Sequence, residues 1–114
     1  MDGSMRGVLA FCEGLPLDSF EAGGVLIAEG PASGRMFILF EGTVEVLRGE
    51  TQVAEISDAG AIFGEMAALL GGAHTATVRA TGPVKAYRID DAKAFMRSGN
   101  EIVYHVATIL ARRL

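Results

Sequence analysis

The chain has 114 residues, which is close to the usual size of one domain with a single hydrophobic core. Half of the residues are hydrophobic and 21% are charged, a composition that excludes the disordered class. The net charge of −4 argues against a nucleic-acid surface, and no stretch approaches the roughly 18 apolar residues of a membrane span. We therefore expect one cytoplasmic domain over residues 1–114, without a DNA-binding or catalytic domain.

Short apolar segments separated by glycine dominate the chain, and 15 of its residues are glycine. A short helix is expected before Gly14 and Pro16, and the chain from Phe20 onward has the pattern of strands. The expected strands are residues 24–28, 36–40, 43–47, 52–56, 76–80 and 84–89. This spacing predicts a mainly β fold with flanking helices, a jelly-roll-like β-roll or double-stranded β-helix.

One segment interrupts the series of strands. Residues 65–70 are rich in helix formers and directly follow Gly64, so one or two turns of helix are expected before Gly71 and Gly72. The first turn of a helix presents backbone N–H groups without intrahelical partners, and these donors favour an anion. The segment therefore predicts a binding site for a small negative ligand inside the β-roll.

The residues around this turn supply the remaining candidates for the site. Gly64 would allow a ligand to approach the backbone closely. Glu65 stands at the helix entry, where its carboxylate can accept a hydrogen bond from a hydroxyl. His74 and Thr75 return on the next strand and are expected to close the pocket.

Two helices are expected after the last strand. Asp90 is a candidate N-cap for a helix over residues 91–97, and residues 98–100 contain a second break before a helix over Glu101-Leu114. The apolar positions of that last helix recur at helical spacing and include Ile102, Val106, Ile109 and Leu110. This stripe predicts a packing surface, which a second copy of the chain could share as a homodimer.

The sequence carries little of the chemistry that enzymes use. Its single cysteine, Cys12, can form neither an internal disulfide nor a zinc cluster. The two histidines lie far apart and lack the His-x-His pattern with a spaced glutamate of metal-binding β-barrels. No Gly-x-Ser-x-Gly motif, P-loop or catalytic cysteine–histidine set is present. We therefore expect no enzyme, no metal and no cofactor.

Two motifs at matched spacing suggest a family. They are Phe63-Gly64-Glu65-Met66-Ala67 and Ala76-Thr77-Val78-Arg79-Ala80. The earlier matching positions are Phe20, Gly23-Gly24, Glu29-Gly30, Phe37-Ile38-Leu39, Gly42, Val44-Glu45-Val46 and Gly60. In these residues nearly the whole chain resembles the cyclic nucleotide-binding domain, the sensor module of the catabolite-activator family, cyclic-nucleotide-dependent kinases and gated channels. Phe-Gly-Glu alone is a weak signal, and its spacing to Ala-Thr-Val-x-Ala makes the match specific.

The resemblance implies a β-roll with a phosphate-binding cassette, and cAMP or cGMP as the ligand. In the family, backbone N–H groups of the cassette bind the cyclic phosphate and its glutamate binds the ribose 2′-hydroxyl. By position this implies Gly64, Met66 and Ala67 for the phosphate and Glu65 for the ribose. Thr75 matches the serine or threonine that helps to hold the phosphate or the base.

The chain departs from the family pattern at His74, where the resemblance implies an arginine, usually after proline. Arginine offers a permanent charge to the cyclic phosphate, whereas histidine is mostly neutral at pH 7. Losing one partner of a buried charge pair costs about 2–5 kcal/mol, roughly 30-fold to several-thousand-fold in affinity. A bound phosphate could recruit a proton onto His74, or Arg35 or Arg79 could reach in, although strand alternation places Arg79 on the opposite face.

Two main hypotheses follow. The first is a regulatory module that senses a cyclic nucleotide, with binding weakened by His74 and with the helices from Asp91 onward shifting to report it. The alternative is a β-roll that has lost nucleotide binding and serves as a dimerisation or protein-interaction scaffold through Glu101-Leu114. A third hypothesis is a sensor of a different small anion that suits histidine better.

Overall fold

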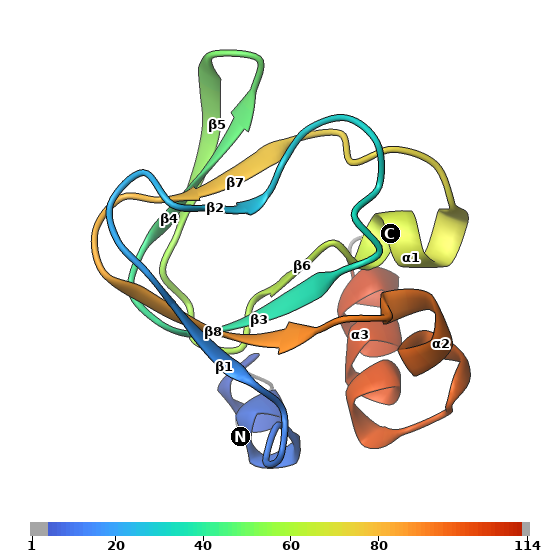
Figure 1. The fold of residues 1–114 in the computed structure, drawn as a ribbon. Helices are drawn as coiled ribbons and strands as arrows, with labels where there is room; N and C mark the ends of the chain where they lie inside the picture. The colour runs from blue at the N-terminus through green and yellow to red at the C-terminus, as the bar shows by residue number, and fades with distance from the viewer. Residues whose placement is uncertain (1–4, 113–114) are drawn as a thin grey trace.

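The computed structural model describes residues 5–112, with the side chains of residues 7–104 and 106–108, and this part of the chain forms eight strands and four short helices. The first half comprises η1 (Met5–Phe11, a 3-10 helix), β1 (Leu17–Phe20), β2 (Val25–Ile27), β3 (Met36–Glu41), β4 (Val44–Arg48) and β5 (Thr51–Ile56). The second half comprises β6 (Ile62–Phe63), α1 (Glu65–Leu70), β7 (Thr77–Ala80), β8 (Val84–Ile89), α2 (Ala92–Arg97) and α3 (Glu101–Arg112) (Figure 1).

The strands form two four-stranded sheets in which all strand pairs are antiparallel. One sheet has the order β1-β8-β3-β6 and the other has the order β2-β7-β4-β5. The two sheets face each other, and η1, α2 and α3 lie beyond the β1-β8-β3-β6 sheet, on its side away from the other sheet (Figure 1). This arrangement confirms the predicted mainly β fold with flanking helices.

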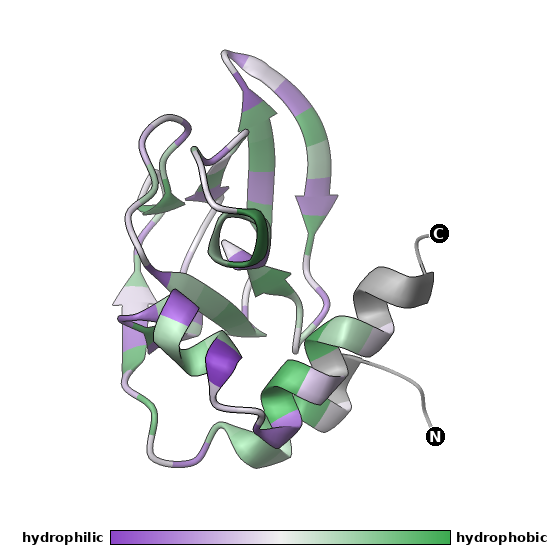
Figure 2. Cartoon of the chain, turned by 90° about the vertical axis from the view of Figure 1, so that its right-hand side faces the viewer, coloured by the Kyte–Doolittle hydropathy of each residue, from purple (hydrophilic) through white to green (hydrophobic). Residues whose placement is uncertain are grey.

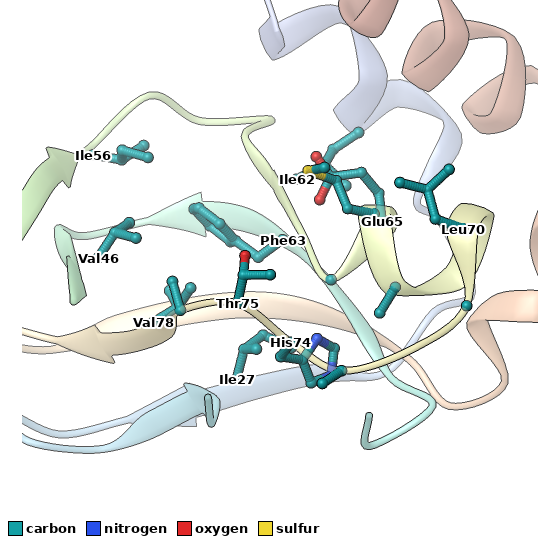
Figure 3. A pocket seen from close by; sticks show the side chains of 16 residues that line it. Ile27, Val46, Ile56, Ile62, Phe63, Glu65, Leu70, His74, Thr75 and Val78 are labelled. Carbon is teal, nitrogen blue, oxygen red and sulfur yellow. The ribbon is translucent and has the colours of Figure 1, made fainter. Parts of the chain in front are cut away.

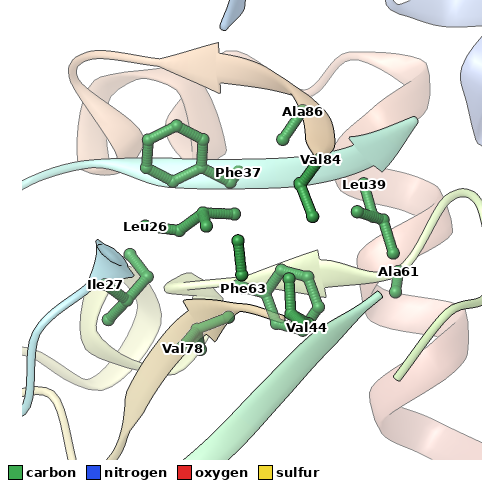
Figure 4. Close-up of a cluster of buried hydrophobic side chains, with 11 residues drawn as sticks. Leu26, Ile27, Phe37, Leu39, Val44, Ala61, Phe63, Val78, Val84 and Ala86 are labelled. Carbon is green, nitrogen blue, oxygen red and sulfur yellow. The ribbon is translucent and has the colours of Figure 1, made fainter. Parts of the chain in front are cut away.

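Strand β3 shows why the sequence has a continuous apolar run in this region. Phe37 and Leu39 point between the two sheets and belong to the central cluster of buried side chains (Figure 4). Met36 and Ile38 point the other way and pack in a second cluster with residues of η1, α2 and α3. Because both faces of β3 are covered, the alternation of a half-buried strand is absent.

The edge strand β1 was not predicted from the sequence. Its polar residue Asp18 faces β8, where Arg88 Nη1 donates to both carboxylate oxygens at 2.6 and 2.7 Å. The hydrogen bonds to Asp18 raise the pKa of Arg88 most, and the bond from Arg88 Nε to Asp90 Oδ1 at 2.8 Å raises it further. The strand is therefore fixed by an ion pair with β8 that is not visible in the local pattern.

The helix caps differ in one position from the expected ones. Asp91, not Asp90, caps α2, and its Oδ1 accepts the N–H of Ala94 at 3.0 Å. Asp90 is instead held by its ion pair with Arg88. The expected break before the last helix is confirmed, since Asn100 Oδ1 accepts the N–H of Val103 at 3.0 Å.

Helix α3 packs against η1, and part of its apolar stripe is buried within the chain. Ile102 and Val106 are 3% and 1% exposed. The side chains of Ile109 and Leu110 lie outside the described residues. No helix among residues 5–112 is long and apolar enough to cross a membrane.

Candidate functional site

A cavity of about 330 Å³ lies between α1 and the β2-β7-β4-β5 sheet (Figure 3). All six residues that the sequence singled out line it, namely Gly64, Glu65, Met66, Ala67, His74 and Thr75. The volume falls at the lower end of the range for small-molecule sites, about 300–1,000 Å³. The fold thus brings together the residues of the helical turn and the residues that follow it on the way to β7.

One wall of the cavity is apolar and comes from five different strands. Its side chains are Ile27 of β2, Val46 of β4, Ile56 of β5, Phe63 of β6 and Val78 of β7 (Figure 3). The sequence analysis did not assign these residues to the site, because their individual segments show only the pattern of strands. A flat aromatic ring could be buried against this wall, while the polar groups lie toward α1.

Gly64 precedes α1 in a left-handed conformation, with φ of +93°. A Cβ at this position would lie 2.6 Å from the carbonyl oxygen of Arg35 and 3.2 Å from Cα of Met36. The group that approaches Gly64 closely is thus the start of β3, whereas the sequence analysis expected a ligand there. The glycine allows α1 to begin directly against the sheet.

Helix α1 presents its first turn to the cavity. The N–H of Ala68 bonds to the carbonyl of Gly64 at 3.3 Å, so the N–H groups of Glu65, Met66 and Ala67 precede the first intrahelical bond. Glu65 is buried, at 8% exposed, in a position where the helix dipole favours a carboxylate. Helix α1 is seen end-on in Figure 2, and most of its residues are hydrophobic. One of them, Leu70, lines the cavity although this residue is 77% exposed.

His74 is buried, at 7% exposed, and is held on two sides. Its backbone pairs with Gly30 through N–H···O bonds of 2.7 and 3.0 Å. Its ring Nε2 accepts the backbone N–H of Ser33 at 3.1 Å, and the Ser33 hydroxyl lies 3.2 Å from the same nitrogen. A backbone N–H can only donate, so in this arrangement Nε2 carries a lone pair and the ring is neutral with its proton on Nδ1.

Neither arginine that could replace the missing cation lines the cavity. Arg79 Nε donates to Glu45 Oε2 at 2.9 Å across the β4–β7 pair, on the face that strand alternation predicts. Arg35 Nε lies 3.6 Å from Asp90 Oδ1, and Arg35 and Lys93 line a neighbouring hollow of about 220 Å³, to which His74 also contributes. Among the described residues, the cavity beside α1 is thus lined by no lysine or arginine.

Ser33 is the functional candidate that the sequence analysis missed. It lies in the loop between β2 and β3, far from His74 in the sequence, and no local motif marks it. Only the pairing of Gly30 with His74 brings the two side chains together. In the part of the chain with described side chains, no group of three or more His, Cys, Asp or Glu could hold a metal ion.

The comparisons with known proteins agree with this geometry. Residues 17–97 match the family model of the cyclic nucleotide-binding domain. The structure of PKAR CBD2 with bound Sp-2Cl-cAMPS has a TM-score of 0.72 and 27% identity, with 98% of this chain and 71% of that chain covered. The cAMP-bound structure of PfPKA-R (141–441) has a TM-score of 0.72 and 28% identity over 99% of this chain and 37% of that chain.

A third similar structure is the regulatory subunit of a cAMP-independent protein kinase A from Trypanosoma brucei. Its TM-score is 0.72 and its identity is 27%, with 87% of this chain and 35% of that chain covered. The present chain therefore spans little more than a third of the length of two of these three structures.

Proposed function

Because the chain belongs to the cyclic nucleotide-binding domain family, we propose that it is a regulatory module that binds cAMP or cGMP in the cavity beside α1, with an affinity lowered by His74. The observation that carries the proposal is the cavity itself, where the first turn of α1, a buried glutamate and an apolar wall meet. The backbone donors of the helix turn suit a phosphate, the glutamate suits a ribose hydroxyl, and the apolar wall suits a base.

Each part of the ligand has a counterpart among the lining residues. The backbone at Gly64, Met66 and Ala67 would donate to the cyclic phosphate, and Glu65 would accept a hydrogen bond from the ribose 2′-hydroxyl. Thr75, which lines the same cavity, would add a hydroxyl to the phosphate or the base. The base would pack against the apolar wall formed by residues such as Ile56 and Phe63.

The lowered affinity follows from the chemistry at His74. The ring supplies no permanent charge, and its Nε2 already accepts the N–H of Ser33. A cyclic phosphate therefore depends on backbone donors, which carry partial charges only. Relative to an arginine at this position, we expect binding to be weaker by about 30-fold or more.

Calorimetric titration with cAMP and cGMP at pH 6 and pH 8 tests the proposal. We expect weak but saturable binding at both pH values. The His74→Arg variant should bind more tightly. Absence of heat at millimolar ligand, in the native protein and in His74→Arg alike, would refute nucleotide sensing.

The second candidate is a regulatory β-roll that no longer responds to cyclic nucleotides. It is favoured by the histidine at position 74 and by the similarity to a regulatory subunit of a cAMP-independent kinase. In that case the chain would act as a scaffold through Glu101-Leu114. Ile102 and Val106 are already buried within the chain, so these two side chains are not available to a second copy. A sedimentation series in protein concentration tests dimerisation.

A further inference from the structure

The cavity beside α1 is poorly equipped to neutralise an anion. Among the described residues, no lysine or arginine lines it. Arg79 is engaged by Glu45 on the outer face of the sheet, and Arg35 lies near Asp90 and lines the neighbouring hollow. Helix α1 has six residues, so few peptide dipoles add up at its first turn.

The histidine that occupies the place of the expected cation is held in a neutral form. Its Nε2 accepts the N–H of Ser33, which cannot rotate away as a side-chain donor could. Protonation at Nε2 would place two N–H donors against each other in a buried position. The structure therefore favours a polar but uncharged group at His74.

An uncharged ligand avoids the cost that this arrangement imposes on a phosphate. A buried anion without a paired cation loses its hydration and recovers only part of that free energy from hydrogen bonds. A ribose hydroxyl needs no counter-ion, and it can accept a backbone N–H as well as donate to a carboxylate such as Glu65. The apolar wall with Ile56, Phe63 and Val78 serves the base equally in both ligands.

We propose that this cavity selects an uncharged ribonucleoside over the corresponding cyclic nucleotide, with His74 as the residue that sets the preference. The inference rests on the proposed function in that it uses the same cavity and the same ribose contact. It differs in the ligand class, because the cyclic phosphate becomes a disadvantage. A purine ribonucleoside carries ribose hydroxyls that can bond to Glu65 and a flat ring that can pack against the apolar wall, and it lacks the charge.

The experiment compares two matched pairs, adenosine with cAMP and guanosine with cGMP, by calorimetric titration of the whole chain. For the native protein we expect at least one nucleoside to bind about 10-fold more tightly than its cyclic nucleotide. His74→Arg should reverse the order, with the cyclic nucleotide gaining about 30-fold or more and the nucleoside changing little. His74→Gln is the control, since its amide oxygen can accept the N–H of Ser33 without adding charge, and it should keep the native order.

The possible outcomes separate the two proposals. Tighter binding of cAMP or cGMP than of the nucleosides to the native protein would overturn the nucleoside preference and leave cyclic nucleotide sensing intact. An unchanged order in His74→Arg would show that position 74 does not set the preference and would also overturn the inference. Absence of binding for all four ligands, with His74→Arg equally inactive, would overturn both the inference and the proposed function.

Discussion

The backbone N–H of Ser33 donates a 3.1 Å hydrogen bond to Nε2 of His74. This bond joins the loop between β2 and β3 to the segment that enters β7, and it fixes the tautomer of a buried ring. The histidine is therefore neither a solvent-facing residue of the loop nor a ready substitute for a cation. Its chemistry in the cavity is that of a polar, neutral group.

The tautomer of His74 can be observed directly. We expect nitrogen NMR of the ring near pH 8 to show the proton on Nδ1 and a lone pair on Nε2, because Ser33 supplies the hydrogen to Nε2. Ser33→Ala retains the backbone N–H and should leave the tautomer unchanged. A proton on Nε2 would instead mean that the ring donates to the Ser33 hydroxyl, which lies 3.2 Å away.

The sequence predicted the fold well where the signal is local. Glycines together with apolar or alternating segments marked six of the eight strands, and Asn100 marked the start of α3. It failed where the stabilising partner is distant, as for β1, whose Asp18 pairs with Arg88 of β8. The prediction of Asp90 as N-cap failed for the same reason, since Arg88 and Arg35 hold Asp90 from outside the helix.

The site was predictable to a similar extent. The residues of the helical turn are consecutive and carry a recognisable motif, so Gly64 and Glu65 could be assigned to it. The tautomer of His74 could not be predicted, because it depends on Ser33, which only the folded chain brings near. The reason for Gly64 was also hidden, since the clash that excludes a side chain comes from the backbone of Arg35.

A methyl group at Gly64 should destabilise the fold more than the same change at Gly72. Both glycines have positive φ, +93° and +91°, so each alanine variant suffers the strain of the left-handed region, about 1–2 kcal/mol. Nothing lies within 4 Å of a Cβ at Gly72, whereas at Gly64 it would meet the Arg35 carbonyl oxygen at 2.6 Å. We expect urea denaturation to show a loss of about 3 kcal/mol or more for Gly64→Ala. Equal losses for the two variants would show that α1 does not start against β3.

Replacing Glu65 by glutamine should weaken ligands that carry a ribose 2′-hydroxyl. A hydrogen bond to a charged group is worth about 1.5–3 kcal/mol and a neutral one about 0.5–1.5 kcal/mol, so we expect a loss of about 10-fold in affinity. The 2′-deoxy form of the same ligand is the control, and Glu65→Gln should leave its binding nearly unchanged. A similar loss for both forms would remove Glu65 from the ribose contact.

The thiol of Cys12 should be unreactive in the folded chain and should make stability depend on pH above 9. Burial raises the pKa of Cys12 to about 11, above its usual value of about 8.5. Between these values the unfolded chain releases the proton first, so stability falls as pH rises, by up to about 1.4 kcal/mol per pH unit. Alkylation of the Cys12 thiol at pH 8 should be far slower in the folded chain than in denaturant. An identical pH dependence of stability in Cys12→Ala, or rapid native alkylation, would contradict the burial of this thiol.

The docking of α3 can be tested by comparing a buried and an exposed side chain of the same helix. Ile102 is 3% exposed and packs in the cluster with Val8 and Met36, whereas Tyr104 is 74% exposed. We expect Ile102→Ala to lower the free energy of unfolding by about 2–5 kcal/mol, and Tyr104→Ala to change it by about 0.5 kcal/mol or less. Urea denaturation at several protein concentrations measures both effects. A small loss for Ile102→Ala would mean that α3 is not held by the chain itself, and its apolar stripe would then be free to bind a second copy.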